Sequence, residues 1–162
     1  MKNLKLLLGA TAALALLTAC GGSAREAAGN PPAGDAVSVQ EVDGLGQTLV
    51  DASGKTLYFA DQEADGTIKC TESCLSFWFP AEGTDSTAKS VDGLAVVKRP
   101  DSGESQLTFQ GKPLYTFKLD TGAGQHKGHN LEDAFGNTTF TWRAATTGAA
   151  PTQAPADPGY DY

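Results

Sequence analysis

The sequence predicts a mainly β protein, built from two related β-hairpin repeats that pack as a small sandwich or barrel between disordered tails. The 162 residues include 19 glycines and eight prolines, which indicates many turns and few long helices. Apolar and polar residues alternate over several short stretches, as they do in half-buried strands. Two short segments also recur in the same order, and such a recurrence indicates a duplicated unit.

The repeat consists of two matched segments separated by spacers of unequal length. Val-Asp-Gly-Leu occurs at 42–45 and at 91–94, and Gly-Lys-x-Leu-Tyr occurs at 54–58 and again at 111–115. The unequal spacing indicates that one copy carries a loop insertion. Together the two copies are predicted to form one β domain over residues 41–143.

Each copy is expected to place a tight turn between two strands. Two-residue turns are predicted at 53–54 and 110–111, because glycine readily takes the positive φ that tight hairpins need. Alternation with a period of two is clear at 106–110, 114–119 and 139–142. These segments are therefore predicted to be the main strands of the second copy.

The N-terminal segment predicts export and lipid anchoring. Two lysines precede an apolar run over 6–17, which has the composition of a signal peptide and is too short to span a membrane comfortably. The next residues, Leu-Thr-Ala-Cys at 17–20, resemble the lipobox of bacterial lipoproteins, where cleavage leaves the cysteine at the new N-terminus. We therefore predict a signal peptide at 1–19 and lipidation of Cys20.

The regions on either side of the β domain lack any apolar period. Residues 20–40 are predicted to form a lipidated flexible tether, and residues 144–162 form a low-complexity tail rich in Ala, Thr, Pro and Gly. This organisation predicts a protein of the bacterial cell envelope. It would lie on the outer membrane facing the periplasm in a Gram-negative cell, or on the outer face of the plasma membrane in a Gram-positive one.

Charge and motif content narrow the class of function. The chain carries 12 Lys and Arg against 19 Asp and Glu, a formal net charge of −7, so an electropositive nucleic-acid surface is not expected. No serine-nucleophile motif and no phosphate-binding glycine loop occurs in the sequence. The sequence thus favours a membrane-anchored binding or interaction module over an enzyme, with the membrane and an envelope protein as its expected partners.

Residues 46–142 resemble the bacterial secreted-repeat lipoproteins described by a Yx(FWY)xxD motif. The second copy carries the motif intact with Tyr115, Phe117 and Asp120, whereas the first copy departs from it at the aromatic and has Glu63 at the acidic position. The resemblance implies a bacterial surface lipoprotein and supplies no reaction. Alternate residues of a strand share one face, so we expect a core-facing aromatic pair with a turn aspartate; a ligand-binding role is the alternative.

Cys70 and Cys74 match two cysteines that the family carries in its first copy. An exported protein meets an oxidising environment, so a disulfide between them is expected. The bridge needs an irregular turn, because residues four apart on a regular helix have Cβ atoms about 5–6 Å apart, too far for a disulfide. The alternative is envelope copper binding, thiol-redox chemistry or electron transfer with a redox partner, since soft thiolates with His126 or His129 suit copper. The same two histidines, in a glycine-rich loop, are also a candidate zinc or copper site.

An acidic loop in the first copy resembles a calcium-binding loop of the EF-hand kind. Asp61, Glu63 and Asp65 alternate along it, Gly66 permits a sharp turn, and Glu72 follows. Carboxylates at alternate positions can converge on a hard cation, so these residues are a candidate calcium site, with a solvated acidic loop as the alternative.

Overall fold

A computed structural model describes residues 36–148 of the chain. The predicted signal peptide, Cys20, most of the predicted tether and the end of the predicted tail lie outside these residues. The described part is mainly β, with antiparallel sheets, as predicted. Within it, no helix is both long and apolar enough to cross a membrane.

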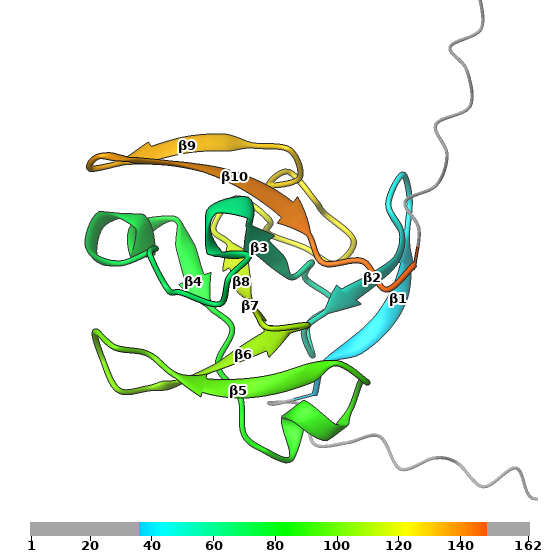
Figure 1. Ribbon diagram of the computed structural model, residues 1–162. Helices are drawn as coiled ribbons and strands as arrows, with labels where there is room; N and C mark the ends of the chain where they lie inside the picture. The colour runs from blue at the N-terminus through cyan, green and yellow to red at the C-terminus, as the bar shows by residue number, and fades with distance from the viewer. Residues whose placement is uncertain (1–35, 149–162) are drawn as a thin grey trace, which may run out of the picture.

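Short strands linked by turns and single-turn 3₁₀ helices make up the described chain (Figure 1). The strands are β1 (Ser38–Val42), β2 (Gly46–Val50), β3 (Tyr58–Ala60), β4 (Trp78–Pro80), β5 (Leu94–Lys98), β6 (Ser105–Phe109), β7 (Lys112–Pro113), β8 (Tyr115–Phe117), β9 (Glu132–Phe135) and β10 (Thr138–Ala144). The 3₁₀ helices are η1 (Asp61–Glu63), η2 (Glu72–Ser76) and η3 (Thr87–Lys89).

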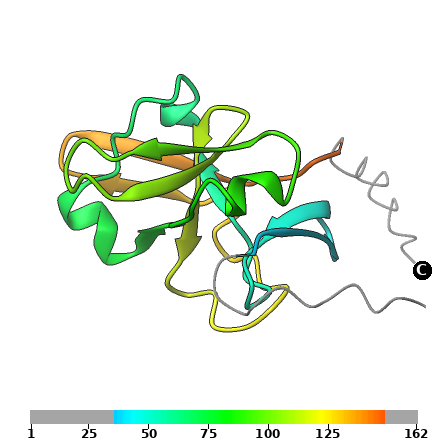
Figure 2. The same cartoon turned by 90° about the horizontal axis from the view of Figure 1, so that it is seen from below.

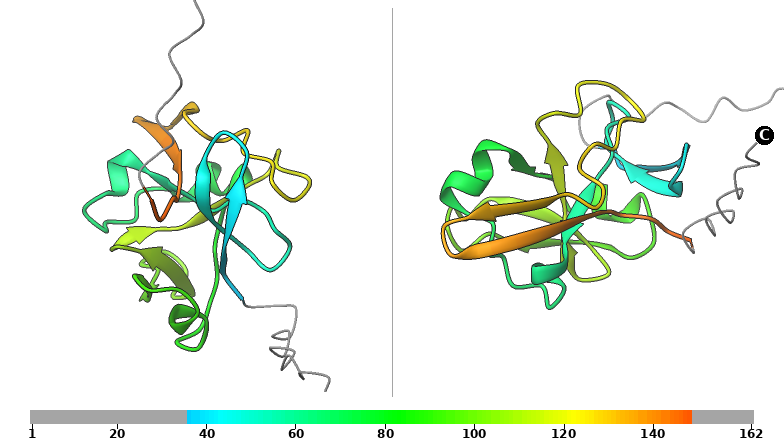
Figure 3. Two further views of the ribbon diagram at one scale, coloured as in Figure 1. Left: turned by 90° about the vertical axis from the view of Figure 1, so that its right-hand side faces the viewer. Right: turned by 90° about the horizontal axis from the view of Figure 1, so that it is seen from above.

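The strands form three antiparallel sheets. The largest has the order β4-β8-β3-β10-β9 and is curled, while β5-β6-β7 and β1-β2 form smaller sheets. The β9–β10 and β5–β6 hairpins lie on opposite sides of the short central strands, and Figure 2 shows the two hairpins one behind the other. The β1–β2 hairpin lies at one end of the molecule, as the right view of Figure 3 shows, and it faces the viewer in the left view. There a bridge between Thr48 and Thr146 connects it to the chain after β10.

The two copies of the repeat are wound around each other. β3 of the first copy and β8 of the second are adjacent, with Tyr58 opposite Tyr115. β4, from the first copy, pairs with β8, whereas β10, from the second copy, pairs with β3. Each copy therefore adds its tryptophan-bearing strand to the tyrosine-bearing strand of the other copy.

The register shows that this exchange obeys a local pseudo-twofold symmetry. Trp78 is opposite Phe117, which is two residues after the repeated tyrosine of the second copy. Trp142 is opposite Ala60, which is two residues after the repeated tyrosine of the first copy. The backbone hydrogen bonds repeat in the same way. Leu57 N donates to Leu49 O as Leu114 N does to Leu107 O, and Ala145 N donates to Leu57 O as Ala81 N does to Leu114 O.

Alternating residues of the central strands enter two different cores. Tyr58 and Tyr115 belong to a core around the two tryptophans, whereas Leu57 and Leu114 belong to a second core with the leucines of β2 and β6. In the first core the rings of Trp78 and Trp142 stack with centroids 3.7 Å apart. Each copy thus contributes to both cores.

Three boundaries differ from the sequence prediction. β1 begins at Ser38, inside the predicted 20–40 tether, because its residues pair with β2. Backbone pairing also continues beyond 143, since Thr147 N donates to Gln47 O. The first turn is a three-residue loop rather than a two-residue one: Asp51 N donates to Lys55 O, and only Gly54 within the loop has a positive φ, of 77°. The second turn has two residues, as predicted.

Candidate functional site

The motif residues form crossed tyrosine–carboxylate pairs between the two copies. The Tyr58 hydroxyl donates to Asp120 Oδ2 at 2.5 Å, and the Tyr115 hydroxyl donates to Glu63 Oε1 at 3.2 Å. All four side chains are buried. Burial raises the pKa of both tyrosines, and the neighbouring carboxylate raises each further. Each repeated tyrosine is therefore a neutral donor to the acidic residue of the other copy.

Both acids also hold the loop that follows them. Glu63 Oε1 accepts the backbone N–H groups of Lys69 at 2.6 Å and Cys70 at 2.7 Å, while Asp120 Oδ1 accepts the N–H of Lys127 at 3.0 Å. Burial raises the pKa of Glu63, although the hydrogen bonds that Glu63 accepts from Cys70, Lys69 and Tyr115 oppose the shift. Phe117 is buried as well, so the aromatic pair of the motif faces the core and its aspartate lies just after β8.

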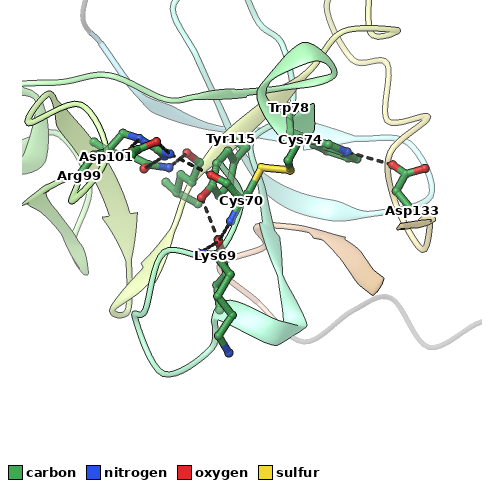
Figure 4. The surroundings of a disulfide bond; sticks show 11 residues. Lys69, Cys70, Cys74, Trp78, Arg99, Asp101, Tyr115 and Asp133 are labelled. Carbon is green, nitrogen blue, oxygen red and sulfur yellow. Dashed lines mark hydrogen bonds and ion pairs between the residues drawn. A yellow bond between two sulfur atoms is a disulfide. The ribbon is translucent and has the colours of Figure 1, made fainter. Parts of the chain in front are cut away.

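Cys70 and Cys74 form a disulfide with their Cα atoms 5.3 Å apart. The turn between them is irregular, as its spacing required: Thr71 is extended, Glu72 has a φ of 50°, and η2 begins at Glu72. The buried Arg99 lies on one side of the bridge and donates to the carbonyl of Cys70 at 2.9 Å (Figure 4).

The acidic residues of the predicted calcium loop are not brought together. Glu63 is buried among backbone donors, Asp61 pairs with Arg143 at 3.1 Å, and Asp65 accepts the N–H of Thr67 within its own turn. The fourth predicted ligand, Glu72, is exposed at the disulfide. Alternation along the sequence does not put these residues on one face because η1 turns Glu63 inward.

The two histidines do not join the cysteines. His126 Nδ1 lies 3.3 Å from the carbonyl of Gly124, while His129 Nδ1 accepts the N–H of Ala144 at 3.1 Å. Burial lowers the pKa of His129, and Arg143 and His126 lower it further. Across residues 36–148, no three His, Cys, Asp or Glu side chains are grouped closely enough to hold a metal ion. The predicted copper and zinc sets are therefore not assembled in the described part.

A cavity of about 500 Å³ lies where the two copies meet. Three of its lining residues come from the first copy, and the second copy supplies basic and aromatic side chains through β6, β7, β10 and the loop before β9. The principal lining side chains are Leu45, Phe59, Phe109, Lys112, His129 and Arg143. Lys112 Nζ lies 4.1 Å from the centroid of the Phe59 ring, at cation–π distance.

Of these cavity residues, only His129 was predicted from the sequence to belong to a functional site. Lys112 belongs to the repeated Gly-Lys segment, so the repeat itself carried a signal there. Phe59 and Arg143 carried none, because each is an ordinary strand residue whose partner across the cavity is distant in sequence. Arg143 is held by Asp61 through Nε and by Asn130 through Nη1.

Residues 95–145 match the family model of a secreted repeat of unknown function. This is consistent with the resemblance to secreted-repeat lipoproteins, and the matched segment covers the second copy, from β5 to β10. The match supports an exported protein whose activity is not established. No curated protein and no solved structure matches the chain significantly.

Proposed function

We propose that this protein is a membrane-anchored lipoprotein whose β domain binds a small molecule in the cavity between its two copies. The observation that carries the proposal is the cavity itself, which requires both copies. Phe59 comes from the first copy, while Lys112 and Arg143 come from the second. Its volume of about 500 Å³ lies within the usual range of ligand pockets, and it combines apolar walls with a few polar groups.

The crossed architecture supports this function because it makes the cavity rigid. The cavity walls include β3 and β10, which pair in register from Trp142–Ala60 to Ala144–Tyr58. The crossed tyrosine–carboxylate bonds also tie β3 to the segment after β8, and β8 to η1, which follows β3. A site built on paired strands is preorganised, so little ordering cost opposes binding.

The anchor is tested by metabolic labelling with a palmitate analogue. We expect label on the wild-type chain and none on Cys20→Ala, because the thiol of Cys20 is the predicted acylation site. Fractionation should place the labelled wild type with membranes. Equal labelling of the two chains would contradict the lipid anchor and leave the cavity proposal standing.

Cavity binding is tested by blocking the cavity from one of its walls. Thr146 lines the cavity and is partly exposed, so Thr146→Trp should fill it without entering the core. The probe is the neutral aromatic 2-naphthamide, measured by isothermal titration with the full chain in lipid nanodiscs. We expect its affinity to fall about tenfold or more in Thr146→Trp, the equivalent of about 1.4 kcal/mol.

The matched control is Thr147→Trp, one residue further along, where the side chain is exposed and outside the cavity. It adds the same indole to the same segment, so it should bind 2-naphthamide like the wild type. Circular dichroism of all three chains checks that each is folded. Unchanged affinity in Thr146→Trp would contradict the cavity as the binding site.

A further inference from the structure

The cavity between the two copies is positively charged in a protein that is acidic overall. Lys112 and Arg143 line it, and among the described residues neither Asp nor Glu does, although the formal net charge of the chain is −7. Arg143 donates a hydrogen bond through Nε to Asp61, which is not a lining residue, and another through Nη1 to Asn130. Within residues 36–148, no hydrogen bond from the remaining Nη2 group is found.

His129 adds a neutral donor to these two cations. Its Nδ1 accepts the backbone N–H of Ala144 at 3.1 Å, so in the neutral ring the proton is on Nε2. Because burial lowers its pKa, the ring is neutral near pH 7 and Nε2 is a hydrogen-bond donor. The polar groups of the three side chains are thus all donors, a set suited to a carboxylate or another anion.

Much of the rest of the wall is apolar, and part of it is aromatic. The ring of Phe59 carries Lys112 Nζ on its face at 4.1 Å, and Phe109 and Leu45 are also among the lining residues. An anion alone would leave these surfaces in water. A ligand with an aromatic or otherwise flat apolar body would cover them while its anionic group meets the donors.

The pseudo-twofold symmetry supplies an internal comparison. A second cavity of about 300 Å³ lies at the equivalent place, where Thr116, Pro80 and Glu82 stand in the positions of Phe59, Ala144 and Thr146. Of the residues in the described range 36–148, two acids, Asp51 and Glu82, and no basic side chain line this second cavity. The fold therefore does not require basic residues at this position, and the two copies have diverged in charge.

We infer that the cavity lined by Lys112, Arg143 and His129 selects organic anions with a flat apolar body, such as aromatic carboxylates. This rests on the proposed binding function and adds the chemical class of the ligand. Selectivity comes from the two fixed cations, while the apolar walls contribute affinity for any ligand of the same shape. Most of the affinity for a neutral isostere should therefore come from the walls.

The test compares 2-naphthoate with its neutral isostere 2-naphthamide by isothermal titration. With the wild-type chain we expect 2-naphthoate to bind about tenfold tighter or more, as charge-assisted hydrogen bonds are about twice as strong as neutral ones. In Lys112→Gln/Arg143→Gln that preference should fall to about twofold or less, while the affinity for 2-naphthamide is unchanged. The matched control is Lys55→Gln, the equivalent lysine of the first copy, which does not line the cavity and should keep the full preference.

The outcomes separate this inference from the proposed function. Equal affinity of the wild type for the two probes, or a preference that survives in Lys112→Gln/Arg143→Gln, would overturn the anion inference and leave cavity binding intact. Loss of preference in Lys55→Gln would show a long-range charge effect and would also overturn it. If neither probe binds the wild type, the proposed function fails, and the anion inference fails with it.

Discussion

Replacing Trp142 with alanine is expected to lower the free energy of unfolding by about 3–5 kcal/mol, as for other large aromatic side chains removed from a core. Trp142 is fully buried, and its ring stacks on Trp78 with an interplanar angle of 11°. Because Trp142 comes from the second copy and Trp78 from the first, the cavity left behind would lie at the junction of the copies. Urea unfolding followed by far-ultraviolet circular dichroism measures the loss.

A matched control comes from the symmetry-related strand. Phe79 lies on β4 next to Trp78 and is 43% exposed, so Phe79→Ala removes an aromatic ring at the surface. Its effect should stay within about 0.5 kcal/mol. If Trp142→Ala cost no more than Phe79→Ala, the tryptophan stack would not be the centre of the fold.

Replacing Glu63 with alanine is expected to lower the free energy of unfolding by about 2–4 kcal/mol, because buried donors left without an acceptor cost about 1–3 kcal/mol each. Those donors are the N–H groups of Lys69 and Cys70 and the hydroxyl of Tyr115. The substitution also removes the free-energy cost of burying a carboxylate, which offsets part of that loss. The measurement is urea unfolding at pH 7, with Asp65→Ala, an exposed acid two residues further along, as the control, which should change little.

The same residue should leave a signature in the pH dependence of stability. Burial raises the folded-state pKa of Glu63 above its ordinary value of 4.5, so above pH 4.5 the folded state keeps a proton that the unfolded state has lost. The stabilisation is complete below pH 4.5 and is lost as the pH rises through the folded-state pKa. Relative to Glu63→Gln, which does not titrate, the wild type should become progressively less stable toward neutral pH. Parallel stability profiles of the two chains would contradict this assignment.

Local patterns in the sequence were sufficient for the class of fold and for the repeat. Alternation with a period of two predicted the strands, since it depends only on successive side chains pointing to opposite faces. The second turn was predicted correctly because Gln110 and Gly111, with φ of 51° and 81°, form a two-residue turn whose geometry is local. The same local rule failed at the first turn, where Asp51 Oδ1 accepts two backbone N–H groups and supports a longer loop.

The misassigned acidic loop shows where a local pattern misleads. Asp61, Glu63 and Asp65 look equivalent in the sequence, yet Glu63 is fully buried and the other two face solvent. What distinguishes Glu63 is Tyr115, 52 residues away, which reaches it only because β3 and β8 are paired. The family motif did distinguish Glu63 from the other two acids, because Glu63 stands in the first copy where Asp120 stands in the second.

The sequence by itself determined the mainly β class, the duplicated unit and the resemblance to a secreted repeat, because each depends on neighbours along the chain or on composition. It favoured the pairing of Cys70 with Cys74 and left copper or thiol-redox chemistry as the alternative. Only the tertiary structure decided that the copies exchange strands, that each tyrosine binds the acid of the other copy, and that Phe59 and Arg143 line one cavity. Those features depend on which strands lie side by side. Strand pairing between distant segments is set by packing of the whole core and leaves no periodic mark on either segment.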